Sequence, residues 1–175
     1  ADNLSTGRRE NLPAECKFIE IDLGDRSQYG KLSDIRFDSV LHLAGQSSGE
    51  ASFADPWYDF NSHVTSTFLL LALSRERGVR RFIYASSMAV YGDTQAIPVM
   101  EDHPKLPKTF YGAAKLAAES YVTLHHSLGI DTTVFRMFSV YGPNQDLANK
   151  IQGMASIYLS YLLEQRPILV KGSAD

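Results

Sequence analysis

A tyrosine and a lysine lie four positions apart in a segment rich in alanine, Phe110–Glu119. Alanine and leucine favour helix, so the spacing predicts that Tyr111 and Lys115 lie on one helix face, one turn apart. A free phenol has a pKa of about 10, and a neighbouring ammonium is expected to stabilise the phenolate and draw that pKa toward neutrality. Such a pair could remove a proton from an alcohol. The same spacing also occurs on ordinary surface helices, so the rest of the chain must distinguish the two interpretations.

The composition describes an ordinary globular protein. Of 175 residues, 44% are hydrophobic and 21% are charged, which is enough for one sizeable core and predicts one domain. The net charge of −3, with no basic run, argues against nucleic-acid binding. A single cysteine, Cys16, excludes an internal disulfide, and no metal site is predicted. No apolar run reaches membrane-spanning length and no signal peptide is recognisable, so a cytoplasmic location is expected.

Strand and helix patterns alternate along the chain. Apolar or β-branched runs predict strands at 17–23, 37–44, 81–87, 132–137 and 168–170. Helical patterns occupy 25–35, 56–77, 154–165 and a segment from Tyr111 that ends before Gly129. Residues 45–54 and the proline-containing stretch 88–108 read as loops, and the second is long enough to indicate a functional loop. This order predicts an α/β fold with a parallel sheet covered on both faces.

Small and polar residues follow four of the predicted strands. Because ligands gather at the carboxyl ends of parallel strands, these segments are expected to line one site together with the tyrosine and the lysine. The segments are Asp22-Leu23, Ala44-Gly45-Gln46, Ser86-Ser87 and Phe138-Ser139.

Seven short motifs make the chain resemble the extended short-chain dehydrogenases, and among them the NAD-dependent nucleotide-sugar epimerases and dehydratases. They occur in the family's order and span nearly the whole sequence. The motifs are Asp2-Asn3-Leu4-Ser5-Thr6-Gly7, Asp22-Leu23, His42-Leu43-Ala44-Gly45, Asp55-Pro56, Ser86-Ser87-x-x-Val90-Tyr91-Gly92, Tyr111-x-x-x-Lys115 and Arg136-x-Phe138-x-x-Tyr141-Gly142-Pro143.

The resemblance implies a role for each site residue. Tyr111 would be the catalytic acid/base, Lys115 would tune it and bind the nicotinamide ribose, and Ser87 would bond the substrate hydroxyl or the ketone formed from it. The remaining residues would hold NAD, with a carboxylate at the adenine ribose that disfavours NADP. These cofactor-binding residues are Asp2, Asn3, Asp22, Leu23, Ala44, Gly45 and Phe138.

Two positions depart from the family pattern. His63 and Ser139 each stand where relatives commonly have asparagine, and Ser139 is expected to contact the substrate.

The Gly-rich fingerprint G-x-x-G-x-x-G of the family does not occur in this sequence. We therefore expect a β-α-β start upstream, and residues 1–175 as part of a Rossmann-like doubly wound NAD-binding domain. Residues 144–175 would lead into the substrate-binding part of a protein of about 300 residues. Without the helix N-terminus that holds the pyrophosphate, the 175 residues alone are expected to be inactive.

The residues after Ser87 select among the family's reactions. Dehydratases usually carry an Asp-Glu pair where this chain has Met88 and Ala89, which cannot do acid/base chemistry. The sequence therefore predicts epimerisation of a nucleoside-diphosphate sugar, with C4 the commonest position. The alternatives are a reductase, synthase or dehydratase of deoxysugar biosynthesis, and a non-catalytic Rossmann-like binding protein. The resemblance also implies a homodimer formed through the segments 68–73 and 113–124.

Overall fold

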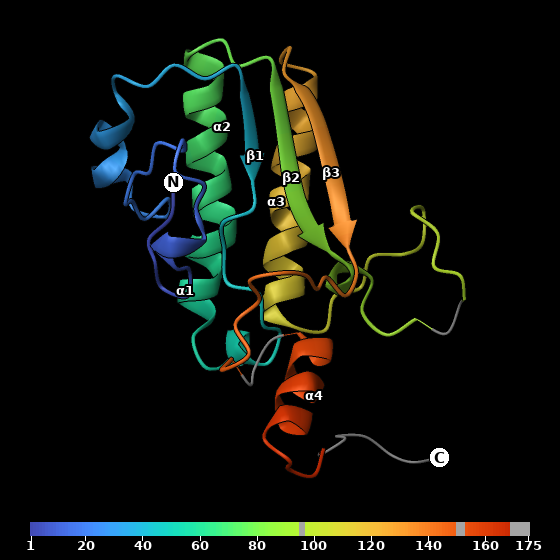
Figure 1. Ribbon diagram of the computed structural model, residues 1–175. Helices are drawn as coiled ribbons and strands as arrows, with labels where there is room; N and C mark the ends of the chain where they lie inside the picture. Colours follow the sequence, from blue (N-terminus) through green and yellow to red (C-terminus); the bar gives the residue numbers. More distant parts are fainter. Residues whose placement is uncertain (95–96, 150–152, 169–175) are drawn as a thin grey trace. The chain divides into compact units, whose positions relative to one another are not determined.

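The computed structural model describes residues 1–94, 97–149 and 153–168, and the chain divides into two compact units, Ala1–Met137 and Phe138–Asp175. The first unit contains a three-stranded parallel sheet in the order β1-β2-β3 (Figure 1). Its strands are β1 (Ser39–His42), β2 (Arg81–Ser87) and β3 (Asp131–Met137). The predicted α/β class and parallel pairing are confirmed.

Three α-helices of the first unit accompany the sheet. A side-chain cap and an N-terminal proline start the first of them, since Asp55 accepts a hydrogen bond from the Tyr58 amide at 2.8 Å. The third also starts with a side-chain cap, in which Thr109 accepts from the Gly112 amide at 3.0 Å. The helices are α1 (Pro56–Phe60), α2 (Ser66–Glu76), α3 (Phe110–His126) and, in the second unit, α4 (Met154–Leu163).

Short helical turns fill several connections. A π-helical turn, Asn61–Thr65, joins α1 to α2. The 3₁₀ turns are Arg9–Asn11, Arg26–Leu32, Ala51–Phe53 and Met88–Tyr91. No helix in the described ranges is both long and apolar enough to span a membrane.

The core lies between the sheet and the helices α2 and α3, which run along one face of it (Figure 1). Alternate strand residues point to this face, so Phe82 and Tyr84 are fully buried. They pack in one cluster with Leu71 of α2 and with Ala118 and Val122 of α3. Burial of these faces fixes how α3 lies against β2, the strand that carries Ser87.

The opposite face of the sheet differs from the prediction that both faces are covered. Leu41 is 60% exposed and Phe135 54% exposed, although each lies within a strand. The strand order supplies the reason. Two right-handed crossovers that advance in the same direction, from β1 to β2 and from β2 to β3, place both helices on the same side.

The strand predicted at 17–23 was also wrong as a full strand. The segment forms one isolated parallel bridge, in which the Asp2 amide donates to the Ile19 carbonyl at 3.2 Å and the Ile21 amide donates to the Asp2 carbonyl at 3.0 Å. Within the described residues, Asp2 is its one ladder partner, and a single residue pair does not make a strand. The hydrophobic alternation of this segment correctly indicated that Ile21 is buried. It could not indicate how many residues of the segment pair with a neighbouring strand.

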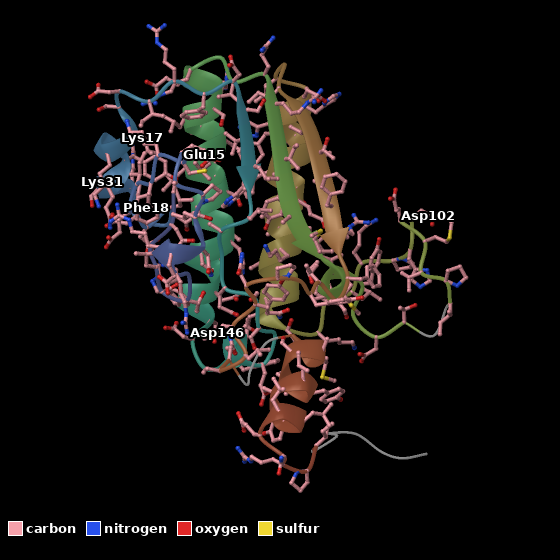
Figure 2. The ribbon with its side chains drawn as sticks, viewed as in Figure 1. Glu15, Lys17, Phe18, Lys31, Asp102 and Asp146 are labelled. Carbon is pink, nitrogen blue, oxygen red and sulfur yellow. The ribbon has the colours of Figure 1, made fainter. Side chains whose placement is uncertain are left out.

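The other predicted elements differ mainly at their ends. The strands at 81–87 and 132–137 are confirmed, the strand at 37–44 is shortened to β1, and the helix at 25–35 is the 3₁₀ turn Arg26–Leu32. Lys31, labelled in Figure 2, belongs to this turn. Its Nζ donates a hydrogen bond to the Glu20 carbonyl at 2.8 Å. The loop at 88–108 begins with a 3₁₀ turn, and the helices predicted at 56–77, from Tyr111 and at 154–165 are present, the first with a π-helical interruption. The strand predicted at 168–170 falls on residues 169 and 170, outside the described residues.

Leu71 provides a test of this core. It is 0% exposed between α2 and the sheet, so we expect Leu71→Ala to lower the free energy of unfolding by about 2–5 kcal/mol through lost burial and a residual cavity. Urea unfolding followed by circular dichroism measures the change. Leu106→Ala is the control, because the 66% exposed Leu106 side chain should change stability by less than about 0.5 kcal/mol. Equal effects of the two substitutions would contradict this position of the core.

Candidate active site

The end of β2 and the start of α3 meet at one edge of the sheet. Ser87 is the last residue of β2 and accepts a hydrogen bond from the Ala89 amide at 3.2 Å, which starts the following 3₁₀ turn. Gly112 in the first turn of α3 packs against that turn so closely that a Cβ would lie 2.5 Å from the Ala89 carbonyl oxygen. Only glycine permits this approach. The contact brings Tyr111 of α3 within reach of Ser87.

Tyr111 interacts with the Ser87 side chain through a hydrogen bond, so the phenol and the serine singled out in the sequence lie close together. The pKa of Tyr111 is raised, chiefly by burial, whereas the hydrogen bond with Ser87 lowers it and the charge of Asp59 raises it. The expectation that the lysine would draw this pKa toward neutrality is therefore not met, because burial of the phenol outweighs the groups that favour the phenolate.

Lys115 lies one turn further along α3 and is only 5% exposed. Its Nζ donates to the Ala85 carbonyl of β2 at 2.7 Å and lies 5.8 Å from the centre of the Tyr111 ring and 4.9 Å from that of Tyr84. Burial lowers the pKa of Lys115 to about 8, and the charges of Asp59 and then Glu119 oppose that shift. The ammonium form therefore predominates at neutral pH and is lost as the pH rises through about 8.

A second group of buried polar side chains backs the tyrosine. Asp59 of α1 is 1% exposed and accepts a hydrogen bond from Gln46 Nε2 at 2.8 Å. His63 of the π-helical turn is fully buried, with Nε2 3.7 Å from Asp59 Oδ1. Its ring stands edge-to-face against the Tyr111 ring, with the two centres 5.3 Å apart. Burial lowers the pKa of His63 far below its ordinary value, so the imidazole is neutral.

Sequence reasoning missed Asp59 as a site residue and noted His63 only as a departure from the family pattern. Asp59 lies within the helix predicted at 56–77, where an aspartate is usually exposed. His63 lies in the π-helical turn, which no sequence pattern used above predicts.

Glu119 and Arg136 form an ion pair next to the same group. Arg136 of β3 holds Glu119 through both nitrogens Nε and Nη2, with the shortest contact 2.8 Å from Nη2 to Oε2. The Ser86 hydroxyl donates to the same carboxylate. Glu119 follows Lys115 by one further turn of α3, so the lysine lies between the phenol and this carboxylate on one helix face.

Two of the predicted cofactor-binding residues, Asp2 and Asp22, accept hydrogen bonds from backbone amides two residues further along the chain. Asp2 Oδ1 accepts from the Leu4 amide at 2.6 Å, and Asp22 Oδ1 from the Gly24 amide at 2.8 Å. Gly45 has φ +144°, and a Cβ there would come within 2.5 Å of the His63 ring.

The other predicted cofactor residues vary in exposure. Asn3 is exposed, Leu23 is buried and Ala44 is partly buried. Phe138 and Ser139 are exposed and belong to the second unit. In the described ranges, no group of three or more histidine, cysteine, aspartate or glutamate side chains is placed to hold a metal ion.

Known proteins resemble this chain in sequence and in fold. A family model described as "NAD dependent epimerase/dehydratase family" matches residues 1–175. The chain is 34% identical to UDP-glucose 4-epimerase of Mycolicibacterium smegmatis, over 99% of this chain and 58% of that protein. It superposes on the UDP-glucose 4-epimerase of Thermotoga maritima, solved with UDP-glucose, with a TM-score of 0.91 and 31% identity over 98% of this chain and 56% of that one. The Thermus thermophilus UDP-glucose 4-epimerase, solved with NAD, gives a TM-score of 0.86 and 33% identity over 95% of this chain and 55% of that one.

The chain thus spans a little over half the length of the relatives it matches. The family model covers every residue of the sequence. The chain belongs to the NAD dependent epimerase/dehydratase family.

Proposed function

We propose that the protein is an NAD-dependent epimerase that inverts C4 of a nucleoside-diphosphate sugar, a UDP-sugar by analogy with its relatives. The observation that carries this proposal is the Ser87–Tyr111 hydrogen bond with the Lys115 ammonium one turn away. The named functions of the relatives, which are UDP-glucose 4-epimerases, support it. The absence of an acidic group at Met88 and Ala89 argues against dehydration, which needs further acid/base groups beside the tyrosine.

Three residues would share the acid/base work. Tyr111 would take the proton of the C4 hydroxyl as the hydroxyl is oxidised and return it when the alcohol re-forms. Ser87 would hydrogen-bond the same oxygen in both its hydroxyl and its keto form. Lys115, charged below a pH of about 8, would stabilise the phenolate through the field of its ammonium. Bound NAD would supply a hydride acceptor that later returns the hydride to the other face of the sugar.

The residues of the first unit fit such a dinucleotide. A partly exposed carboxylate, Asp2, stands at the end of the bridged segment, where it could accept hydrogen bonds from ribose hydroxyls. Gly45, after β1, lets the His63 ring pack directly against the backbone, and the dinucleotide would pass close to this segment. Asn3, Asp22, Leu23 and Ala44 would complete the adenosine side of the site, and Tyr111 and Lys115 the nicotinamide ribose side.

We also propose that residues 1–175 are part of an NAD-binding Rossmann-like domain and that 144–175 lead into the substrate-binding part. Phe138 would contact the cofactor, and Ser139 the substrate. Coverage of a little over half of each longer relative supports this division. The 175 residues alone are expected to be inactive, and the experiments on activity below therefore use the full-length protein.

A homodimer through α2 and α3 forms part of the proposal. Phe68 of α2 and Tyr121 of α3 pack edge-to-face at 5.7 Å, and both remain substantially exposed, as does Leu124. Such an apolar surface is typical of a protein contact. Sedimentation velocity of the full-length protein should give a dimer, and Phe68→Glu should shift it toward monomer. A monomeric wild-type protein at micromolar concentration would refute this part.

Tyr111→Phe tests the mechanism. The substitution keeps the ring against His63 and removes the phenol, so we expect kcat to fall by about 10²–10⁴-fold while NAD stays bound. Interconversion of UDP-glucose and UDP-galactose measures activity, and release of the nucleotide on denaturation measures NAD content. Tyr121→Phe, on the same helix, is the control: it keeps the ring that packs on Phe68 and removes only a hydroxyl, so full activity is expected. Undiminished turnover by Tyr111→Phe would eliminate the mechanism.

The absorbance of added NAD(P)H separates an epimerase from a reductase. An epimerase restores its bound cofactor in each cycle, so we expect sugar interconversion without net consumption of added NAD(P)H. A reductase or synthase with the same Ser87, Tyr111 and Lys115 would consume one NAD(P)H per product molecule. Stoichiometric loss of NAD(P)H absorbance would therefore assign the protein to that alternative. NAD bound without any turnover of nucleotide sugars would favour the non-catalytic alternative.

A further inference from the structure

The Arg136 guanidinium forms hydrogen bonds to three separate segments of the chain. Besides its two-pronged bond to Glu119 of α3, its Nη1 donates to the Tyr91 hydroxyl and to the Glu101 carbonyl, each at 2.8 Å. Tyr91 ends the 3₁₀ turn that follows Ser87, and Glu101 precedes Asp102 in the loop that extends from the sheet (Figure 2). Arg136 is thus bonded to the helix, the turn and the loop that surround Ser87 and Tyr111.

Because Glu119 is paired with Arg136, it does not form an ion pair with Lys115. Glu119 is buried, and its carboxylate receives Arg136 Nε and Nη2 and the Ser86 hydroxyl. Lys115 lies one turn away on the same helix face, a spacing at which a lysine and a glutamate readily pair. Its Nζ instead bonds the Ala85 carbonyl and lies beside the rings of Tyr84 and Tyr111.

Removal of Arg136 would change this balance. A buried carboxylate that loses its cation is strongly unfavourable, and the nearest cation on its own helix is Lys115. The ammonium would then gain by turning toward Glu119 and away from the Ala85 carbonyl.

We propose that Arg136 is a positioning residue: by matching the charge of Glu119, it keeps the Lys115 ammonium at the end of β2, beside Tyr111. This inference uses the role that the proposed function gives to Lys115. Arg136 would affect Lys115 indirectly, through Glu119, without contacting substrate or cofactor.

The other titratable groups around Lys115 also affect its pKa. Glu119 is paired with Arg136, and His42 and His63 are neutral because burial lowers the pKa of each. The charge of Asp59 raises the pKa of Lys115 most, and that of Glu119 raises it less. The groups are Asp59 of α1, His63 of the π-helical turn, His42 of β1, Tyr84 of β2, and Tyr111 and Glu119 of α3.

The test follows the titration of Lys115 itself. In full-length protein labelled with ¹³C at the lysine ε-carbons, Lys115→Arg identifies the resonance of Lys115, and its chemical shift against pH gives the pKa. We expect Arg136→Met to raise that pKa from about 8, because the charge of Glu119, which already raises it, then loses its partner cation. Glu119→Gln alone should lower the pKa, because Arg136 is then the unmatched charge. The double variant Arg136→Met/Glu119→Gln should return it toward the wild-type value.

A matched control separates charge matching from general effects of losing an arginine. Arg81→Met removes an exposed arginine–aspartate pair with Asp131 on the same sheet and should leave the Lys115 titration unchanged. If Arg136→Met does not fold, Glu119→Gln and the double variant still decide the question. An unchanged Lys115 pKa in a folded Arg136→Met or Glu119→Gln variant, or a double variant that differs further from wild type than both single variants, would overturn the proposal.

Kinetics provide a second readout. Arg136→Met should lower kcat at least about tenfold with KM for the sugar nucleotide within about twofold, and the double variant should recover much of kcat. If the double variant recovers the wild-type pKa of Lys115 but not kcat, Arg136 affects only the charge of Lys115. That result would overturn its role in positioning the ammonium. Because the titration needs no turnover, its outcome stands apart from that of the proposed reaction.

Discussion

The buried ammonium of Lys115 is the constraint on which the rest of the site depends. A cation removed from water costs several kcal/mol unless acceptors and opposite charges compensate it. The structure supplies the Ala85 carbonyl at 2.7 Å, two aromatic rings and the field of the buried Asp59. The first of these contacts ties α3 to the end of β2. One interaction therefore sets both the charge beside Tyr111 and the place where Tyr111 meets Ser87.

The two carboxylates nearest to this ammonium have different surroundings. Glu119 is held by Arg136 and Ser86, whereas Asp59 receives a hydrogen bond from the neutral side chain of Gln46. Burial raises the pKa of Asp59, while Gln46 and the charge of Lys115 favour its ionised form. A charge paired with an opposite charge contributes less field to its surroundings than one without a partner cation. This agrees with the order in which the two carboxylates raise the pKa of Lys115, Asp59 first and Glu119 second.

The one-sided packing of the sheet explains how so few elements can build this edge. Since both crossovers advance in the same direction, α2 and α3 share one face and pack on the same core residues, Phe82 and Tyr84. That shared core fixes α3, with its tyrosine and lysine, relative to β2. On the other face of the sheet, Leu41 and Phe135 remain largely exposed.

The sequence by itself determined the order of strands and helices, the parallel sheet, and the candidate trio Ser87, Tyr111 and Lys115. Hydrophobic periodicity and i, i+4 spacing are local properties of the chain, and the family motifs supplied the rest. Only the tertiary structure decided that Asp59 is buried beside His63, that Arg136 neutralises Glu119, and that the pKa of Tyr111 is raised. These outcomes depend on burial and on charges that lie far apart in the sequence, and electrostatic energies are set by distances in space and by exclusion of water. For the same reason, the sequence pattern at 17–23 indicated the burial of Ile21 but not the single bridge to Asp2, because pairing partners are chosen by the fold.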